Sequence, residues 1–185
     1  MRKLKLQMQL SADGFIAGPN GELDWMNMNW DDASKNYVLK LTEPVDCIVM
    51  GRKLAEGFIP YWASAAADPK NADVFAHKMN DIAKIVFSKT LKTADWPNTK
   101  LAANVEDEIT RLKNQAGGDI IVYGGANFAA NLIKANLVDE LNLFYNPVAI
   151  GEGMRLFTER TNLQLVSNTV FSCGIVAVQY KPTKK

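Results

Sequence analysis

The sequence predicts an α/β fold, with helices on both faces of one mixed, mostly parallel sheet. Short, mainly apolar runs at residues 47–51, 84–88 and 119–123 alternate with helix-like segments, a pattern typical of a sheet that is covered on both faces. Two further apolar runs, at residues 163–172 and 173–182, follow each other across Gly174 and predict a C-terminal antiparallel hairpin. The chain of 185 residues is expected to form a single domain over 1–185, since domains commonly hold roughly 100–200 residues.

The first third of the chain contains two strands, one long loop and two helices in this prediction. Residues 4–10 alternate apolar and polar side chains, which is the period of a strand. Turn signals crowd residues 11–25 and predict a loop that holds one short apolar piece at 15–17. Residues 31–42 are expected to be helical, with a stop at Pro44. A short helix is expected at 52–58, followed by a surface excursion over 58–71.

Helices and strands are expected to alternate through the rest of the chain. Residues 72–83 predict a helix and 84–88 a buried strand, followed by a turn and a short strand around Leu101. A helix at 105–118 has acidic residues in its first turn and ends at Gly117 and Gly118, as helix-dipole and C-cap chemistry favour. The buried strand 119–123 precedes a helix at 127–137 and a long strand at 139–150 that Pro147 interrupts.

Composition excludes several classes of function. Lys and Arg number 21 against 20 Asp and Glu, so no strong field would draw the chain onto nucleic acid or an acidic membrane surface. The one histidine, His77, and the isolated Cys47 and Cys173 cannot supply the three or four ligands of a zinc site, and no metal is expected. The cysteines are expected to be buried free thiols. No signal peptide or membrane span is recognisable, which predicts a soluble cytoplasmic protein.

Three of the predicted buried strands end in glycine, basic or hydroxyl residues. Met50 is followed by Gly51, Arg52 and Lys53, Phe87 by Ser88 and Lys89, and Tyr123 by Gly124 and Gly125. If these strands are parallel, their carboxyl ends meet at one edge, where α/β sheets bind ligands. Glycines before a helix let backbone N–H groups approach a pyrophosphate. The basic and hydroxyl side chains could hold a separate phosphate, and a dinucleotide with an extra phosphate is NADP.

Each of these pieces also has an ordinary structural explanation. A Gly-Gly pair after a strand is commonly a plain turn, Arg-Lys a solvated helix start, and Ser-Lys a turn. The sequence contains no GxGxxG motif and no GxxxxGK[ST] motif, so neither the usual dinucleotide fingerprint nor a P-loop is present. The nucleotide-site hypothesis therefore depends on all three strand ends sharing one edge.

Together these motifs resemble the dihydrofolate reductase superfamily. The stretches "MGRK", "KIVFSK" and "IIVYGGANF" are similar to its strand ends, and "SADGFIAGPNG" to its first strand and nicotinamide-covering loop. The stretch "LVDELNLFYNPVAIGEGMRLF" looks more like the riboflavin-biosynthesis reductase branch. The resemblance runs through nearly the whole chain, in order. It implies an NADP(H)-dependent reductase, and relatives in the riboflavin branch imply a homodimer.

The resemblance assigns cofactor contacts to three groups of residues. The adenosine-phosphate contacts would be Gly51, Arg52, Lys53, Ser88 and Lys89. The pyrophosphate cradle would be Gly124, Gly125, Ala126, Asn127 and Phe128. The loop that closes on nicotinamide and ribose would contribute Ile16, Ala17, Asn20 and Gly21, although Ile16 and Ala17 could equally be core residues.

The catalytic candidates are the carboxylates that follow this loop. Hydride transfer also needs a proton, usually from an acid or an ordered water. Asp24 is the first choice and Asp32 the second, because Asp31 and Asp32 are also explained as helix N-terminal acids. The stretch "ELDW" departs from the Pro-Trp turn of folate reductases, which puts folate itself in doubt. Trp25 and Trp30 are the candidate substrate contacts.

Three functional hypotheses follow from these residues. The first is an NADPH-dependent reductase of a small heterocycle, such as a pterin, dihydrofolate or a riboflavin precursor. The second is a non-catalytic NADP- or nucleotide-binding module with the same fold. The third is a binder of a phosphosugar or mononucleotide that uses only the Gly-Gly helix.

Overall fold

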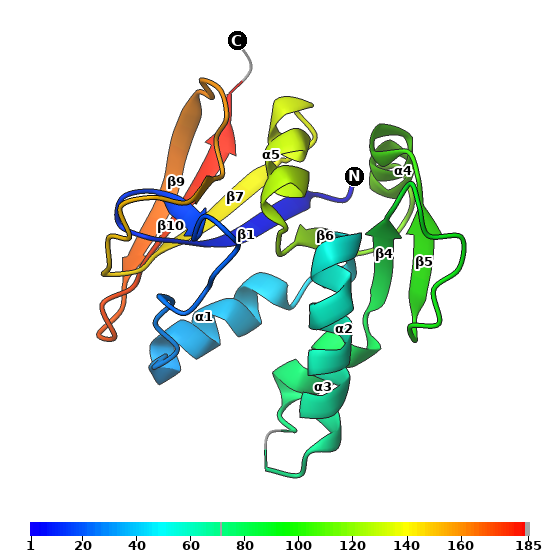
Figure 1. Cartoon of the computed structure of the whole chain (residues 1–185), viewed down its shortest axis with the longest axis horizontal. Helices are drawn as coiled ribbons and strands as arrows, with labels where there is room; N and C mark the ends of the chain where they lie inside the picture. Colours follow the sequence, from blue (N-terminus) through cyan, green and yellow to red (C-terminus); the bar gives the residue numbers. More distant parts are fainter. Residues whose placement is uncertain (71, 184–185) are drawn as a thin grey trace.

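The computed structural model describes residues 1–70 and 72–183 and contains an eight-stranded sheet in the order β5-β4-β3-β6-β1-β7-β10-β9 (Figure 1). Its strands are β1 (Leu4–Leu10), β3 (Val45–Gly51), β4 (Ala83–Phe87), β5 (Thr99–Ala102), β6 (Asp119–Val122), β7 (Glu140–Tyr145), β9 (Leu163–Val170) and β10 (Val176–Pro182). A second, two-stranded sheet pairs β2 (Phe15–Ala17) with β8 (Met154–Arg155).

Strand direction confirms the predicted mixed sheet. The six strands from β5 to β7 run parallel, whereas β10 is antiparallel to both β7 and β9. The turn between β9 and β10 closes through two backbone bonds: Phe171 N–H donates to the Ile175 carbonyl oxygen, and Gly174 N–H donates to that of Phe171. The predicted C-terminal hairpin is therefore present, and it adds two strands to one side of a parallel sheet.

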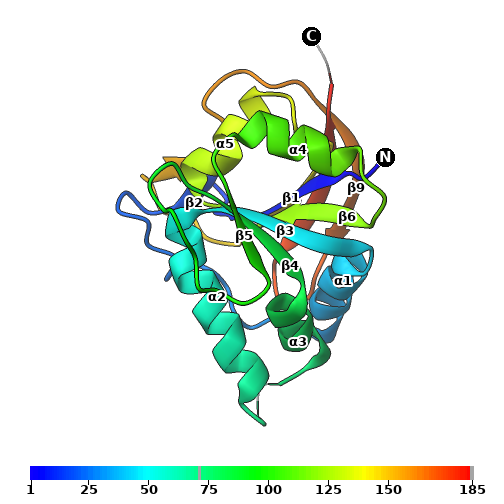
Figure 2. The same cartoon turned by 90° about the vertical axis from the view of Figure 1, so that its right-hand side faces the viewer.

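Helices cover both faces of the sheet, as predicted (Figure 2). The helices are α1 (Asp32–Thr42), α2 (Arg52–Ala67), α3 (Val74–Asp81), α4 (Val105–Lys113) and α5 (Ala126–Lys134). Buried residues of α4 and α5, such as Ile109 and Leu132, pack with Leu4 and Leu6 of β1 in one cluster. On the opposite face, α2 and α3 pack against β3 and β4, and α1 packs against β7 and β10.

The prediction of a surface excursion at residues 58–71 is wrong over most of that range, which is helical. Helix α2 continues to Ala67 and contains Pro60 in its interior. The prediction rested on the Ala, Pro and Asn content of this stretch, whereas the alanines from Ala63 to Ala67 have strong helix propensity. Burial of Ala55 and Ile59 against the sheet adds the tertiary packing that keeps the helix intact. Residue 71 itself lies outside the described residues.

Alternation along β1 does not produce a solvated face. Lys5 and Gln7 are each only 7% exposed, because β1 lies in the middle of the sheet between β6 and β7. Lys5 Nζ lies 2.9 Å from an Asp119 carboxylate oxygen and 3.3 Å from the Leu41 carbonyl oxygen. The centre of the sheet therefore carries polar side chains beneath α1.

Candidate functional site

The three predicted strand ends meet at one edge of the sheet. Gly51 at the end of β3 is the register partner of Phe87 at the end of β4, and Val49 pairs with Val122 of β6. A side-chain carbon placed on Gly51 would lie 3.5 Å from Cβ of Phe128 in α5. The residues after β3, β4 and β6 thus come together, as the prediction required.

Two helices begin at this edge without a side-chain cap. Gly51 is the N-cap of α2 and Gly125 the N-cap of α5, and neither helix has a side-chain capping bond. The other three helices are capped by Asp31, Asp73 and Asn104. The first N–H groups of α2 and α5 therefore keep their hydrogen-bonding capacity, which is the usual arrangement for binding a phosphate at a helix N-terminus.

Gly124 and Gly125 differ in backbone conformation and in the space around them. Gly124 has a φ of 140°, a conformation that L side chains rarely adopt, and its Cβ position would touch Met8 and Leu54 at ordinary contact distances. Gly125 has a φ of −44°, and a Cβ there would meet nothing within 4 Å. The backbone turn therefore requires Gly124, whereas Gly125 leaves a bare peptide facing open space.

Basic and hydroxyl side chains surround the two helix starts. Arg52 forms an ion pair with Glu56 one turn later in α2, at 2.5 Å between Nη1 and Oε1, with both side chains partly exposed. Lys53 and Lys89 are exposed. The Ser88 hydroxyl accepts hydrogen bonds from the N–H groups of Thr90 and Leu91. An exposed pair such as Arg52–Glu56 contributes little free energy, so a phosphate could compete for the guanidinium.

The loop after β1 is held in a compact turn. The Glu22 carboxylate accepts bonds from both the backbone N–H and the side-chain amide of Asn20, and these bonds lower the pKa of Glu22. Asn20 and Gly21 are exposed, while Ile16 and Ala17 are buried in β2. Ile16 also belongs to the main core cluster. Asn20 and Gly21 thus offer an accessible surface, and Ile16 has a clear packing role.

The two candidate catalytic carboxylates lie at the surface. Asp24 and Asp32 are both exposed. Asp32 opens α1, in the position of a helix N-terminal acid. Its neighbour Asp31 is the N-cap: its carboxylate accepts bonds from Ser34 N–H, the Ser172 hydroxyl and Cys173 N–H. The bond from Ser172, followed by that from Ser34, holds the pKa of Asp31 well below its usual range.

The two candidate substrate tryptophans have different surroundings. Trp25 is half-buried, and its indole N–H donates to the Glu22 carbonyl oxygen at 3.1 Å. Trp30 stacks on Phe144 with ring centroids 5.9 Å apart and an interplanar angle of 8°. Its indole N–H donates to the Asn27 carbonyl oxygen. Trp25 therefore contacts its own loop, whereas Trp30 helps α1 pack on the sheet.

Two asparagines that the sequence reasoning missed anchor this loop. Asn27 N–H donates to Oδ1 of Asn146, and the Asn27 amide donates to the Cys173 carbonyl oxygen. Asn146 is 1% exposed, and its amide also donates to Oε1 of Gln9. They join the loop to the end of β7 and to the β9–β10 turn. The position of Asn146 between a strand and Pro147 was the one available signal; Asn27 gave none.

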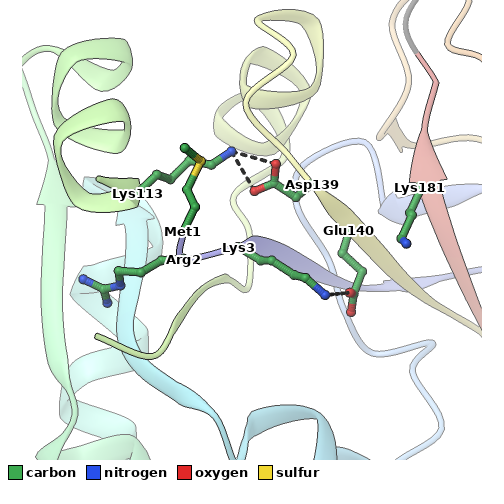
Figure 3. A pocket seen from close by; sticks show the side chains of 7 residues that line it. All are labelled: Met1, Arg2, Lys3, Lys113, Asp139, Glu140 and Lys181. Atoms are coloured by element: carbon green, nitrogen blue, oxygen red, sulfur yellow. Dashed lines mark hydrogen bonds and ion pairs between the residues drawn. The ribbon is translucent and has the colours of Figure 1, made fainter. Parts of the chain in front are cut away.

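The two clearest cavities lie away from the strand-end edge. One, of about 240 Å³, lies near the start of β1 and β7 and is lined by Met1, Arg2, Lys3, Lys113, Asp139, Glu140 and Lys181 (Figure 3). Its carboxylates are already engaged: Asp139 lies 2.6 Å from Lys113 and Glu140 3.8 Å from Lys3. The other, of about 410 Å³, lies between α2 and α3 and is lined by residues that include Tyr61, Trp62 and Phe75. Neither contains a predicted site residue.

Within residues 1–70 and 72–183, no group of three His, Cys, Asp or Glu side chains is placed to hold a metal ion. In the same part of the chain, no helix is long and apolar enough to cross a membrane.

The fold is that of the dihydrofolate reductases. The structure superimposes on a dihydrofolate reductase of Enterococcus faecalis complexed with NADP(H), with a TM-score of 0.64, 16% identity, and coverage of 98% of this chain and 97% of that one. A deaminase/5-amino-6-(5-phosphoribosylamino)uracil reductase of Thermotoga maritima matches with a TM-score of 0.70 and 17% identity over 98% of this chain and 57% of that one. At such identities these structures establish the fold alone.

The chain belongs to the family of RibD C-terminal domains, whose model matches residues 2–177. It is 34% identical over 187 aligned positions to the uncharacterized protein YyaP of Bacillus subtilis, covering 97% of this chain and 94% of that protein. It is 22% identical to the riboflavin biosynthesis protein RibD of Corynebacterium ammoniagenes, covering 80% of this chain and 44% of that protein. The predicted superfamily and branch are therefore confirmed.

Proposed function

We propose that the protein is a cytoplasmic reductase that uses NADPH to reduce a small heterocycle of the pterin, dihydrofolate or riboflavin-precursor kind. The observation that carries this proposal is the pair of glycine-capped helix starts at Gly51 and Gly125, on neighbouring strands of one sheet edge. Membership in the RibD C-terminal family supports an oxidoreductase. The E. faecalis structure of the same fold, which contains NADP(H), supports the choice of cofactor.

The residues at this edge fit the phosphates of NADPH. The N–H groups of Ala126, Asn127 and Phe128, beside the open peptide of Gly125, would bind the pyrophosphate. Arg52, Lys53, Ser88 and Lys89 would bind the additional phosphate that distinguishes NADPH from NADH. Charge-assisted hydrogen bonds of this kind contribute about 1.5–3 kcal/mol each, so the preference for NADPH should be at least about tenfold.

The loop and its carboxylate would complete the reaction site. When bound, NADPH supplies the hydride. Asn20 and Gly21 are exposed at the tip of the loop and would cover the nicotinamide side. Asp24, two residues after Glu22, would donate a proton to the substrate that receives the hydride, or would orient a water that does so. Asp32 is the second candidate for this role. Trp25 would supply the apolar wall beside Asp24.

A nucleotide-binding module without turnover is the second candidate function. The exposure of Asp24 and Asp32 favours it, because an exposed acid lacks the burial that usually tunes a catalytic carboxylate. Such a protein would use the same glycine-capped helix starts and would bind NADPH equally well. Turnover separates it from the reductase.

Titration of NADPH and NADH, followed by nicotinamide fluorescence, tests the cofactor half of the proposal. NADPH should bind at least about tenfold more tightly than NADH. Equal affinities would remove the phosphate role of Arg52, Lys53, Ser88 and Lys89. Loss of NADPH absorbance is then followed with dihydrofolate, dihydropterins and 5-amino-6-(5-phosphoribosylamino)uracil. Tight binding with no turnover of any of them would favour the binding module.

We also propose a homodimer that forms through strand β9. This strand is at the edge of the sheet, and its apolar side chains Leu165, Val166 and Val170 are 53%, 45% and 72% exposed. An exposed apolar edge strand invites pairing with another chain. A second copy would cover both the unpaired backbone and these side chains.

A further inference from the structure

Among the described residues, three buried side-chain oxygens have no hydrogen-bond partner. They are Oε1 of Gln7, the hydroxyl of Tyr123 and Oδ1 of Asn142. Gln7 is 7% exposed and Asn142 is 1% exposed. Folded proteins rarely leave such atoms unpaired, so each one calls for an explanation. Three of them in one place point to a shared cause.

The three residues form one row across adjacent strands. Gln7 of β1 is the register partner of Asn142 of β7. On the other side of β1, Leu6 pairs with Val122, so the next positions along the two strands are Gln7 and Tyr123. The row therefore runs from the end of β6 across β1 to β7, and we call these three residues the oxygen row.

The oxygen row faces the side of the sheet covered by α1 and α2. Leu6 and Val122 pack in the cluster beneath α4 and α5, and neighbouring residues of a strand point to opposite faces. The ring of Tyr123 stacks on Phe58 of α2 with centroids 5.5 Å apart. Phe144, two residues beyond Asn142, packs with Val38 of α1. The two helices lie on the same side of the sheet at an angle to each other (Figure 1).

The orientation of Asn142 is fixed by its neighbour. Its amide nitrogen donates to Oε1 of Glu140 at 3.2 Å. Glu140 is 5% exposed, and its other carboxylate oxygen lies 3.8 Å from Lys3 Nζ. Because the amide N–H faces a carboxylate, Oδ1 is the end left without a partner. A ligand that satisfies this end must therefore present a hydrogen-bond donor.

The oxygen row adjoins the proposed cofactor edge. Tyr123 directly precedes Gly124 and Gly125, so one end of the row lies at the start of the phosphate cradle. From there the row runs away from β3 and β4, whose ends carry the basic side chains, toward β7. A substrate beside the nicotinamide would be placed along this line.

We propose that Gln7, Tyr123 and Asn142 are specificity-determining residues that bind the N–H donors of the heterocyclic substrate. This inference rests on the proposed reductase function and adds the side chains that select its substrate. All three oxygens are buried, so binding requires movement of the side chains that cover them. The unpaired oxygens lower stability and are retained for recognition.

The test uses two probes that differ in their N–H groups. Diaminouracil carries two ring N–H groups and two amino groups, and its ring-dimethylated analogue lacks both ring N–H groups. Each is titrated against the NADPH-saturated protein by calorimetry. Wild type should bind diaminouracil at least about tenfold more tightly than the dimethyl analogue. Gln7→Met and Asn142→Leu, which are close in volume, should lose this preference while binding NADPH normally.

Thermal unfolding distinguishes recognition from a purely structural role. A structural role predicts that the variants have a lower Tm than wild type. Gln7→Met and Tyr123→Phe remove an unpaired oxygen, so their Tm should stay at or above the wild-type value. Asn142→Leu also removes the amide that donates to Glu140, so this variant is used for probe binding alone. A lower Tm with unchanged probe binding would show that the row is structural and overturn the proposal. So would wild type binding neither probe, or both equally. The reductase proposal fails by a different result, namely a wild-type protein that does not bind NADPH or turns over no substrate.

Discussion

At the scale of single residues, two adjacent glycines have separate physical reasons to be glycine. Gly124 has a backbone conformation that other residues rarely adopt, with φ at 140°. Gly125 has an ordinary φ of −44° and open space where a side chain would stand. The fold alone accounts for Gly124 but not for Gly125. A bare peptide at the start of an uncapped helix is what the proposed pyrophosphate contact would require.

The same scale gives a prediction for the proton donor. Asp24→Asn should lower kcat by about 100-fold or more, since positioned acids and bases contribute roughly 10²–10⁴-fold. Its NADPH affinity should not change, because Asp24 is not in the phosphate cradle. Steady-state kinetics with the best substrate of the panel measure kcat, and nicotinamide fluorescence measures binding.

Two comparison variants sharpen this result. Asp32→Asn tests the second candidate, and Glu106→Gln removes an exposed carboxylate from the first turn of α4 on the opposite face. Normal kcat in Asp24→Asn together with a loss in Asp32→Asn would move the role to Asp32. Normal kcat in both would leave a water as the proton source.

At the scale of elements, sequence patterns predicted existence and order better than length. Parallel strands ending in "MG", "FS" and "YGG" placed the candidate edge, because parallel topology alone brings their carboxyl ends together. The length of α2 was missed, since Pro60 reads as a stop when its packing is unknown. The oxygen row was also missed. It depends on the register of β6, β1 and β7, which no local pattern specifies.

A buried ion pair links β1 to β6. Lys5 and Asp119 have side chains that are 9% and 20% exposed, with 2.9 Å between Nζ and Oδ2. Asp119→Asn would leave the Lys5 ammonium buried without its counter-charge. The free energy of unfolding should fall by about 3 kcal/mol, at the low end of the roughly 3–5 kcal/mol seen for broken buried pairs. Urea unfolding measures it, with the exposed Asp95→Asn as the matched control.

The same pair predicts a pH dependence. Burial raises the pKa of Asp119, but hydrogen bonds from Lys5 and from Lys3 N–H outweigh it, so the net pKa lies below the ordinary 3.8. A lowered pKa stabilises the fold above the unfolded value, and that contribution is lost as pH falls through the folded value. Wild type should therefore lose stability below about pH 4, and Asp119→Asn should lose less. Parallel acid profiles would contradict this assignment.

At the scale of the whole molecule, the edge strand β9 predicts assembly. Val166→Lys combined with Val170→Lys places two charges on one face of an exposed edge strand. If the homodimer forms through β9, these charges should dissociate it, as measured by sedimentation velocity. Val74→Lys, at an apolar position on α3 that is 79% exposed, should leave the assembly intact. A monomeric wild type, or a double variant that remains dimeric, would exclude this interface.

At the same scale, some features of the fold could be predicted from the sequence and others could not. Fold class and the meeting of three strand ends at one edge could be predicted, because strand-end motifs and parallel topology act together. Side-chain pairing across loops was not accessible: the Asn27–Asn146 contact joins residues far apart in sequence through one hydrogen bond. The same holds for Trp30, whose stacking on Phe144 depends on where α1 packs.

The measurement that tests the central claim most directly is NADPH binding to Gly125→Val. A Cβ at this N-cap meets no atom within 4 Å, so the free energy of unfolding should fall by about 1 kcal/mol or less. The side chain would nevertheless cover the peptide proposed to receive the pyrophosphate. NADPH affinity should fall by at least about 100-fold, while Gly57→Val, which adds the same side chain in open space on α2, binds normally. Normal NADPH binding by a folded Gly125→Val protein would contradict the account and return Gly124 and Gly125 to a plain turn.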